Sequence, residues 1–449
     1  MYGIYANTID TDWMLGIRIS SPQDFSFQVF GATDLIVDWG DGTSNLYSGN
    51  EVCSHGYATA NYTMSMSGSC DSINFYNGTP TLLTGVLNKI SNIEGITSSA
   101  DLFQGCNNLK SIPNGLFDHA LLISSFQNTF EGCLTLPSIP SRLFYNNISA
   151  SNFQITFGWC RALTSIPPGL FDSNVNATTF AATFILCVDV PSIPSGLFDH
   201  NPLVTTFEQT FESCNSITSI PSGLFDNNPL VTSFAGTFNG CQMTSIPSGL
   251  FDNNPLVTSF NSTFALCDEL ESIPSGLFDN NINVTDFIST FNGCSNLKAI
   301  PSGLFDNNTG VTNFYGTFYG CGDLSSIPDN LFSNNTAVTL FVDTFTSCSL
   351  LSGSIPNLSP FVSLQWIAWT ACRFDGYNAS TLPATLKTVS FHNNNLPVLS
   401  VNQILIDLDT AGAVGGYVNL SGGTNSVPTG LGVAAKNSLL AKAWTVITK

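Results

Sequence analysis

Ten cysteines recur at a nearly constant spacing, and this spacing limits what the chain can fold into more than any other feature. Successive members are 27 residues apart, except for one step of 26 between Cys241 and Cys267. A fixed period of this length is typical of repeat proteins, in which each repeat packs only on its two neighbours. A stack of repeats also suits a chain of 449 residues, which is longer than one compact core usually supports. The ten are Cys106, Cys133, Cys160, Cys187, Cys214, Cys241, Cys267, Cys294, Cys321 and Cys348.

The cysteines are expected to be buried thiols. The chain has 13 of them, and most fall at one phase of the repeat, whereas the disulfide frameworks of small secreted proteins are irregular and even in number. A buried thiol packs as a small hydrophobic group, which suits one narrow slot in every repeat. A disulfide staple is the alternative. Metal binding is disfavoured, because there is no Cys-x-x-Cys pair and the four histidines do not cluster with the cysteines.

The first half of each repeat predicts a short helix. In residues 230–241, the apolar positions are Val231, Phe234, Phe238 and Cys241, spaced three, four and three residues apart. This spacing places them on one face of a helix of 3.6 residues per turn.

The second half of each repeat predicts a short strand and two turns. Met243 to Ile246 is a brief extended run, and the following Pro247 disfavours helical backbone at Ile246. We therefore expect a strand of three or four residues, then a Pro-Ser-Gly turn, and then a polar turn at 252–254.

Stacking explains the large number of phenylalanines. One recurs at the position of Phe238 and another at the position of Phe251, and a single repeat is too small to bury both. Stacked repeats cover them and pair each strand with the next in parallel. The predicted fold is therefore an α/β solenoid of the leucine-rich-repeat type, with about 27 residues per coil and a parallel strand ladder.

The repeat resembles a known family. A segment that ends in Thr-Phe-x-x-Cys, followed by Leu-x-Ser-Ile-Pro, is similar to the BspA-like leucine-rich repeats of bacterial surface proteins, over about residues 95–372. The Ile-Pro-Ser-Gly-Leu-Phe-Asp segment departs from the usual pattern, so the subfamily and the ligand are left open. The resemblance implies an exposed protein that adheres to or interacts with a host, and such repeats also occur in phage genomes.

Residues 1–90 have another character. The order Trp39-Gly40-Asp41-Gly42, then His55-x-Tyr57, then an alternating stretch over 61–68 resembles modules of the polycystic-kidney-disease (PKD) type. The resemblance implies a small all-β sandwich that serves as a spacer or attachment point. Asp38 and Asp41 are weak candidates for a calcium site, and capping of the Gly-rich turn is the alternative role for both carboxylates.

The strict period ends near residue 353, so we divide the chain into 1–90, a repeat solenoid over 91–372, and irregular repeats with a cap over 373–449. A cap is expected because an open solenoid end exposes core and strand edges. The pattern predicts strands at 389–391 and 418–420 and helices at 400–407 and 434–443.

Composition excludes several functions. The 31 acidic against 11 basic residues give a net charge of −20, which argues against nucleic acid and against anionic membranes as partners. No apolar run approaches membrane-spanning length, and residues 1–5 carry no basic segment, so we expect neither membrane insertion nor a signal peptide. Common catalytic motifs are absent, so we expect no enzyme and no cofactor. The aspartates of the repeated turn are expected to cap it, and an acidic ladder that attracts cations is the alternative: Asp118, Asp172, Asp199, Asp226, Asp252, Asp279 and Asp306.

One variable stripe is the candidate binding surface. The residue after the first apolar position of each predicted strand varies between repeats whose other positions are constant, which marks a solvent-facing stripe. We expect it to bind a protein or glycan on a host surface, from a virion or a cell surface. The alternatives are a solvated surface without a ligand and a structural virion component that packs on neighbouring proteins or on copies of itself. The stripe consists of Lys110, Thr164, Thr218, Thr244, Glu271, Lys298 and Ser325.

Overall fold

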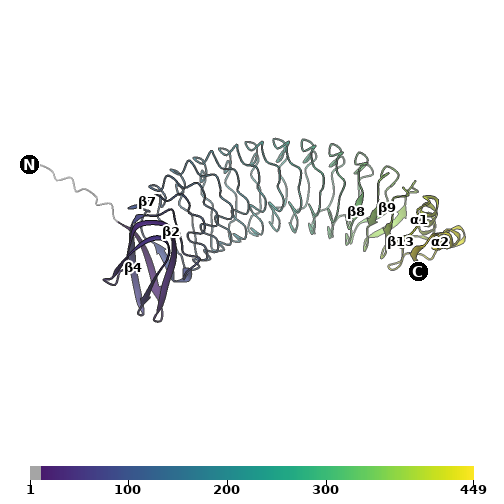
Figure 1. The fold of residues 1–449 in the computed structure, drawn as a ribbon. Helices are drawn as coiled ribbons and strands as arrows, with labels where there is room; N and C mark the ends of the chain where they lie inside the picture. Colours follow the sequence, from purple (N-terminus) through teal and green to yellow (C-terminus); the bar gives the residue numbers. More distant parts are fainter. Residues whose placement is uncertain (1–11) are drawn as a thin grey trace, which may run out of the picture. The chain divides into compact units, whose positions relative to one another are not determined.

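The computed structural model describes residues 12–449, which form two compact units. The first runs to residue 206 and includes 213–216, and the second consists of 207–212 and 217–449. Figure 1 shows the chain coloured along the sequence and labels some of its strands and both α-helices. The expectation that the chain has no signal peptide falls on residues 1–5, which lie outside the described residues.

An antiparallel β-sheet opens the first unit, which confirms an all-β N-terminal region. Hydrogen bonds connect all its strands in one sheet, in the order β3-β2-β4-β1-β6, with β5 on β2 and β7 on β4. The long strand β2 joins different neighbours along its length: its first half pairs with β5 and its second half with β4, with register shifts between Val29 and Leu35. The elements are β1 (Trp13–Ile19), β2 (Gln23–Asp38), β3 (Ser44–Tyr57), β4 (Ala60–Ser69), β5 (Ser72–Asn74), the 3-10 helix η1 (Pro80–Leu82), β6 (Leu83–Val86) and β7 (Ile93–Glu94).

Stacked coils follow the sheet, but the helix predicted for the first half of each repeat is wrong. Residues 235–240 form turns, and Gly236 and Gly240 have left-handed backbone, with φ of +64° and +75°. The amides of Gly236 and Gly240 donate to carbonyls of the next coil, at 2.8 Å and 2.7 Å. Bonds between coils thus replace the bonds within a helix, and the three-four-three apolar spacing arises from successive turns that each point one side chain inward.

The strand of each repeat is also shorter than predicted. In the second half it is reduced to single parallel bridges, such as those that join Ser245, Ser272 and Ala299. A second column of bridges runs through the segment that was predicted to be helical, from Ser98 to Thr206 in the first unit and from Ser233 to Leu340 in the second. The parallel ladder with a step of 26 or 27 residues is confirmed, but its α/β character is not.

Phenylalanine columns form the core, as predicted. The rings of Phe264 and Phe291 stack at a centroid distance of 5.6 Å, and those of Phe251 and Phe278 at 6.3 Å. Rings of the sheet and of the first coil continue this arrangement in the first unit, where Phe75 stacks on Phe103 at 5.9 Å. Burying each ring contributes about 2 kcal/mol.

Polar side chains share this core. In the second unit, the fully buried Asn281 donates from Nδ2 to the carbonyls of Phe251 and Asn254, and the same pair of bonds recurs in neighbouring coils. The thiol of Cys294 donates to the carbonyl of Phe264 at 3.1 Å. All 13 cysteines are free and buried, which confirms a ladder of thiols.

The second unit ends in irregular coils and helices. Its main parallel sheet has the order β14-β13-β12-β10-β8, and a second, two-stranded sheet pairs β11 with β9. The predicted helices and strands of this region are present with shifted bounds, and the two α-helices pack on each other. The elements are β8 (Leu340–Val342), β9 (Ser352–Ile355), β10 (Trp366–Ala368), β11 (Arg373–Tyr377), β12 (Thr388–Ser390), α1 (Val398–Thr410), β13 (Gly416–Asn419), α2 (Gly430–Ala441) and β14 (Trp444–Ile447).

Candidate functional site

Three residues of the predicted stripe, Thr244, Glu271 and Lys298, directly precede the bridged residues Ser245, Ser272 and Ala299. All seven side chains of the stripe are exposed. In the second unit, Lys298 Nζ lies 2.7 Å from Glu271 Oε2, so these two charges are paired. In the first unit, Lys110 lines a pocket together with Arg18. The stripe is therefore on the surface, but its residues do not line one common cavity.

A different surface varies more between coils. Nine coils between Phe126 and Cys348 share the pattern Phe-x-x-Thr-Phe-x-x-Cys, in which the named residues are constant and the four x positions change in size, polarity and charge. We call the side chains at the x positions the variable face. Its first position is occupied by Gln127, Gln154, Ala181, Glu208, Ala235, Asn261, Ile288, Tyr315 and Val342.

The constant, buried residues of each coil fix the backbone that carries the variable face. In the second unit, the Thr317 hydroxyl is buried and bonds the carbonyls of Phe287 and Phe314 at 2.8 Å and 3.0 Å. Cys321 donates from its thiol to the Phe291 carbonyl at 3.3 Å. Each x position is thus anchored by neighbours whose hydrogen bonds are made inside the solenoid.

Two x positions in each coil have left-handed backbone, and several of them are not glycine. Ile155 has a φ of +54°, Trp159 of +62° and Leu266 of +55°. This region is unfavourable for bulky residues and most of all for β-branched ones. Because the same two positions are left-handed in every coil, this backbone belongs to the stacked turns, and amides such as that of Ile155 donate to the next coil, here to the Ala181 carbonyl at 2.9 Å.

In the first unit, the variable face combines amides, acids and one exposed tryptophan. Glu131 Oε2 accepts a hydrogen bond from Gln104 Nε2 of the preceding coil at 2.6 Å, and Asn128 Nδ2 donates to Asp101 Oδ1 of the same preceding coil at 2.9 Å. Trp159 is 42 % exposed, and the guanidinium of Arg161 lies 5.4 Å from its ring centre. This part therefore offers both polar groups and a flat apolar surface.

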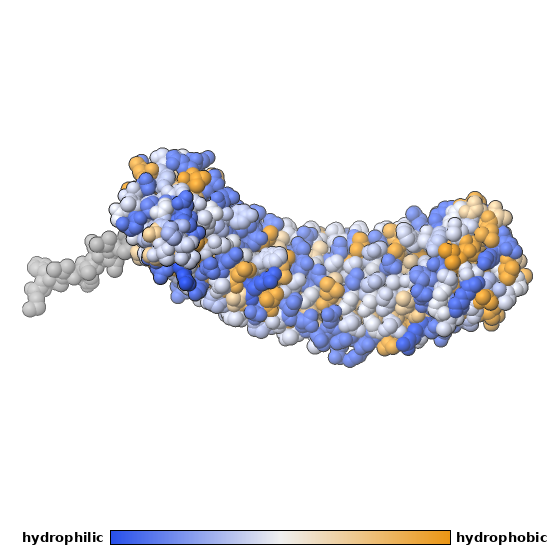
Figure 2. Space-filling view, turned by 90° about the horizontal axis from the view of Figure 1, so that it is seen from below, coloured by the Kyte–Doolittle hydropathy of each residue, from blue (hydrophilic) through white to orange (hydrophobic). Residues whose placement is uncertain are grey.

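In the second unit, the variable face contains a polar depression of about 290 Å³. Glu208, Glu212, Asn239 and Asn261 line it, and Gln209 donates to Glu212 at 2.7 Å. In another coil, Tyr315 and Tyr319 are 45 % and 40 % exposed. Figure 2 shows hydrophobic patches separated by polar surface over the coils.

The spacing of apolar residues predicts a helix for this segment, and the predicted binding surface lies on the strand instead. A comparison of residue variation between coils at every non-core position of the repeat would have identified the variable face from the sequence. The first three x positions vary more than the stripe, and constant core residues flank all four x positions on both sides.

The calcium candidates are engaged in turn contacts. Asp38 accepts the Gly40 amide at 2.8 Å, and Asp41 accepts the amide and the hydroxyl of Thr43. The second oxygen of Asp41 lies 2.7 Å from His55 Nε2. Hydrogen bonds from Thr43 and His55 lower the pKa of Asp41 to about 2. Both carboxylates therefore have the turn-capping contacts that were the alternative to calcium binding.

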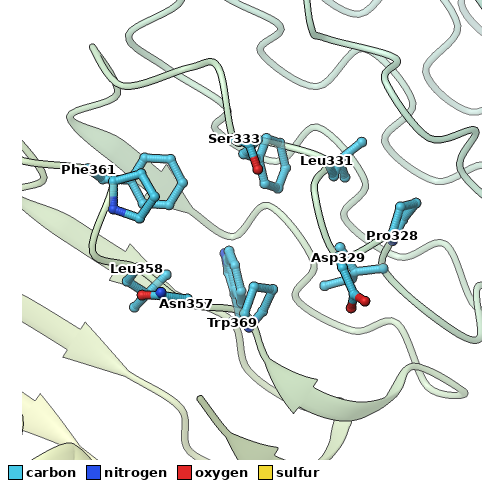
Figure 3. Close-up of a pocket in the computed structure, with 12 residues that line it drawn as sticks. Pro328, Asp329, Leu331, Ser333, Asn357, Leu358, Phe361 and Trp369 are labelled. Atoms are coloured by element: carbon cyan, nitrogen blue, oxygen red, sulfur yellow. The ribbon is translucent and has the colours of Figure 1, made fainter. Parts of the chain in front are cut away.

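The pocket in Figure 3 is too small for a substrate. It lies in the second unit, has a volume of about 30 Å³, and is lined by Asp329, Leu358 and Trp369 among others. The buried Trp369 Nε1 makes no hydrogen bond in the described chain. A space of this size accommodates about one water molecule, which suits a lone N–H donor.

Potential metal ligands do not gather in the part of the chain that the structure describes. No group of three or more His, Cys, Asp or Glu side chains within residues 12–449 could hold a metal ion. The aspartates of the repeated turn do not all share one environment. Asp118 pairs with Lys89 and Asp172 Oδ1 lies 3.4 Å from His200 Nδ1, whereas the backbone carbonyls of Asp252 and Asp279 accept hydrogen bonds from Asn280 and Asn307.

Within residues 12–449, no helix has the length and hydrophobicity needed to cross a membrane.

No protein-family model and no curated protein sequence matches the chain. Similar solved structures include the leucine-rich repeat domain of APL1B, with 17 % identity, a TM-score of 0.33, and coverage of 52 % of this chain and 62 % of that chain. A leucine-rich repeat protein of Leptospira interrogans is 10 % identical, with a TM-score of 0.28 and coverage of 76 % and 95 %. The Drosophila Toll–Spatzle complex is 15 % identical, with a TM-score of 0.32 and coverage of 71 % and 53 %. The chain thus spans less than two thirds of the APL1B and Toll–Spatzle chains.

Proposed function

We propose that this chain is a non-enzymatic recognition protein, and that its variable face binds a protein or glycan on a host surface. The observation that carries the proposal is the division of each coil into constant buried residues and four changing positions, most of which are partly or fully exposed. A scaffold under constraint for stability alone has no need of this division, whereas a binding surface built on a solenoid does.

The chemistry of the variable face suits recognition. Tyrosine and tryptophan supply large contact areas at a low cost in conformational entropy, and Asn, Gln and Ser supply adaptable hydrogen bonds. Tyr315, Tyr319 and Trp159 are exposed on this face, and Asn239 and Asn261 line its depression. The low density of basic groups disfavours a nucleic-acid partner.

The setting is proposed from the resemblance described above. In a BspA-like protein of a virion or cell surface, the PKD-like N-terminal domain is the attachment end and the coils project toward the host. The stripe from Lys110 to Ser325 is a second candidate surface for the same partner.

The alternative is a structural component of a virion that packs on copies of itself or on neighbouring proteins. One observation favours it: exposed aliphatic side chains recur at one turn of the coil, and such patches often mark interfaces. They are 41–62 % exposed, and comprise Leu121, Leu122, Ile148, Val175 and Leu203 in the first unit and Leu230, Leu256 and Ile282 in the second.

Cell binding distinguishes these possibilities. The fluorescently labelled full chain is titrated onto a panel of intact bacterial cells and onto a glycan array. We expect saturable binding that Tyr315→Ser with Tyr319→Ser weakens at least tenfold, while the stripe control Glu271→Gln with Lys298→Gln leaves it unchanged. If the stripe variant weakened binding and the tyrosine variant did not, the binding site would be assigned to the stripe. The absence of saturable binding, together with self-association that Leu230→Ser with Leu256→Ser removes, would favour the structural role.

A further inference from the structure

The first unit contains a pocket of about 290 Å³ that two cationic side chains line. Arg18 reaches it from β1 and Lys110 from the first coil. The other polar groups are the hydroxyls of Ser20, Thr81 and Thr84 and the amide of Asn108. No Asp or Glu is among the described residues that line it.

Local backbone contacts fix this arrangement. Strand β1 pairs with β6, and a register shift between Gly16 and Ile17 lets the Thr84 hydroxyl bond the Gly16 carbonyl at 3.2 Å. The first coil docks here too, because Asn108 Nδ2 donates to the Thr81 carbonyl at 2.7 Å and the Lys110 amide donates to the Thr84 carbonyl at 3.4 Å. The pocket is thus built from three segments that the fold holds together.

The two cations are unusual in such an acidic chain. Only 11 of the 449 residues are Lys or Arg, and 31 are acidic. Three of the other six lysines are paired with carboxylates: Lys89 with Asp118, Lys298 with Glu271, and Lys442 with Asp409. Within residues 12–449, neither Arg18 nor Lys110 forms a salt bridge. Two like charges that share one pocket repel each other unless an anion lies between them.

We propose that this pocket binds a sugar acid, with the carboxylate held by Arg18 and Lys110. Arginine matches the geometry of a carboxylate with paired N–H groups, and lysine adds a mobile positive charge. The volume exceeds what a small inorganic anion fills, and the neutral hydroxyl and amide groups that line the rest suit the hydroxyls of a sugar ring. The site is separate from the variable face, so loss of binding at that face leaves this proposal standing. Lys110 also belongs to the stripe, and Arg18→Gln is therefore the variant that tests the pocket alone.

Glucuronate and glucose provide a matched pair of probes, since they differ only in the carboxylate. Binding of each to the full chain is measured by isothermal titration calorimetry, with Arg18→Gln, Lys110→Gln and the control Lys298→Gln, which lies in the second unit. All three side chains are exposed, and circular dichroism checks that the variants are folded.

We expect glucuronate to bind and glucose not to bind. Each pocket variant is expected to weaken glucuronate binding about tenfold, the loss of one charge-assisted hydrogen bond, and the control to leave it unchanged. Arg18→Lys restores part of the affinity, and raising the salt from about 0.05 M to about 0.5 M weakens binding. Equal binding of glucose and glucuronate, or of Arg18→Gln and the parent chain, would overturn the proposal. Binding of sulfate or phosphate without glucuronate would overturn its assignment to a sugar acid.

Discussion

Replacing Asn281 tests whether the polar ladder inside the coils stabilises the solenoid. Asn281 is fully buried in the second unit, and its Nδ2 donates to the Phe251 carbonyl at 3.1 Å and to the Asn254 carbonyl at 2.9 Å. Its neighbour Asn280 belongs to the same turn but is exposed, with one bond of 3.3 Å to the Asp252 carbonyl. The two residues are therefore a matched pair.

We expect Asn281→Ala to lower the free energy of unfolding by about 2–3 kcal/mol. Two net hydrogen bonds are worth about 1 kcal/mol each, and the small cavity adds to the loss. The loss is limited because the Phe251 carbonyl still accepts from the Asn254 amide and the Asn254 carbonyl still accepts from the Val257 amide. In addition, the substitution breaks no bond of Asn281 Oδ1, which has no hydrogen-bond partner in the described chain. Asn280→Ala is expected to cost about 0.5 kcal/mol or less.

Asn281→Asp keeps the shape but removes both donors and introduces a carboxylate beside two carbonyls. We expect it to cost more than about 3 kcal/mol at neutral pH, because a buried charge without a partner is strongly unfavourable. Burial raises the folded-state pKa of such a carboxyl, so the loss is smallest below its unfolded-state pKa and grows as the pH rises.

The assay is urea unfolding of the full chain, followed by circular dichroism, with hydrogen exchange of peptides from residues 251–281 as a local measure. The local measure is needed because long repeat arrays do not always unfold in one step. If Asn281→Ala were no more destabilising than Asn280→Ala, the interpretation of the asparagines as a structural ladder would be refuted.

Three further predictions follow from strain and ionisation. Burial raises the pKa of Cys160 and Cys214 to about 12 from the ordinary 9.0, so the stability due to neutral thiols is complete below the unfolded-state pKa and is lost as the pH rises toward about 12. The urea midpoint should fall above about pH 9, and an unchanged midpoint at about pH 10 would contradict this. Ile155→Asn copies Asn128 of the preceding coil at a left-handed position and should raise the free energy of unfolding by about 0.5–1 kcal/mol, whereas a lower midpoint would argue against strain. The pKa of Asp41 is lowered to about 2 in the folded chain, so the ionised carboxylate stabilises the fold above pH 3.8, its ordinary pKa. This stabilisation is lost as the pH falls toward 2. Asp41→Asn should therefore lower the melting temperature at neutral pH but not near pH 2, as followed by near-ultraviolet circular dichroism, and an equal loss at both would contradict the pairing with His55.

The repeat spacing was sufficient to predict a solenoid with a phenylalanine core and buried thiols. The spacing of Phe234, Phe238 and Cys241 could not reveal the local backbone, because a helix and a series of turns can place the same side chains inward. What decides between them is the left-handed backbone at positions such as Gly236, together with bonds to the next coil, which appear only when coils are stacked. A lone repeat has no such partners.

The candidate site was harder to predict for a related reason. The predicted strand places Lys110 and Lys298 on the candidate binding surface. Tyr315 and Trp159 fall in the predicted helix and are not among the predicted binding residues. The Asp-Asn-Asn turn was taken as polar surface, although its last residue is buried, as Asn281 shows. The pocket of Arg18 and Lys110 joins segments about 90 residues apart, and spacing alone gives no indication of such a contact.

The most direct test of the proposed recognition role is hydroxyl-radical footprinting of the full chain, free and bound to the cells or glycans identified by the binding screen. Trp159, Tyr315 and Tyr319 are exposed on the variable face, and Tyr76 and Tyr145 are exposed elsewhere, at 54 % and 51 %. We predict that binding protects residues of the first group and leaves the second group as reactive as before. Unchanged reactivity of all three residues of the variable face in the bound chain would contradict the account.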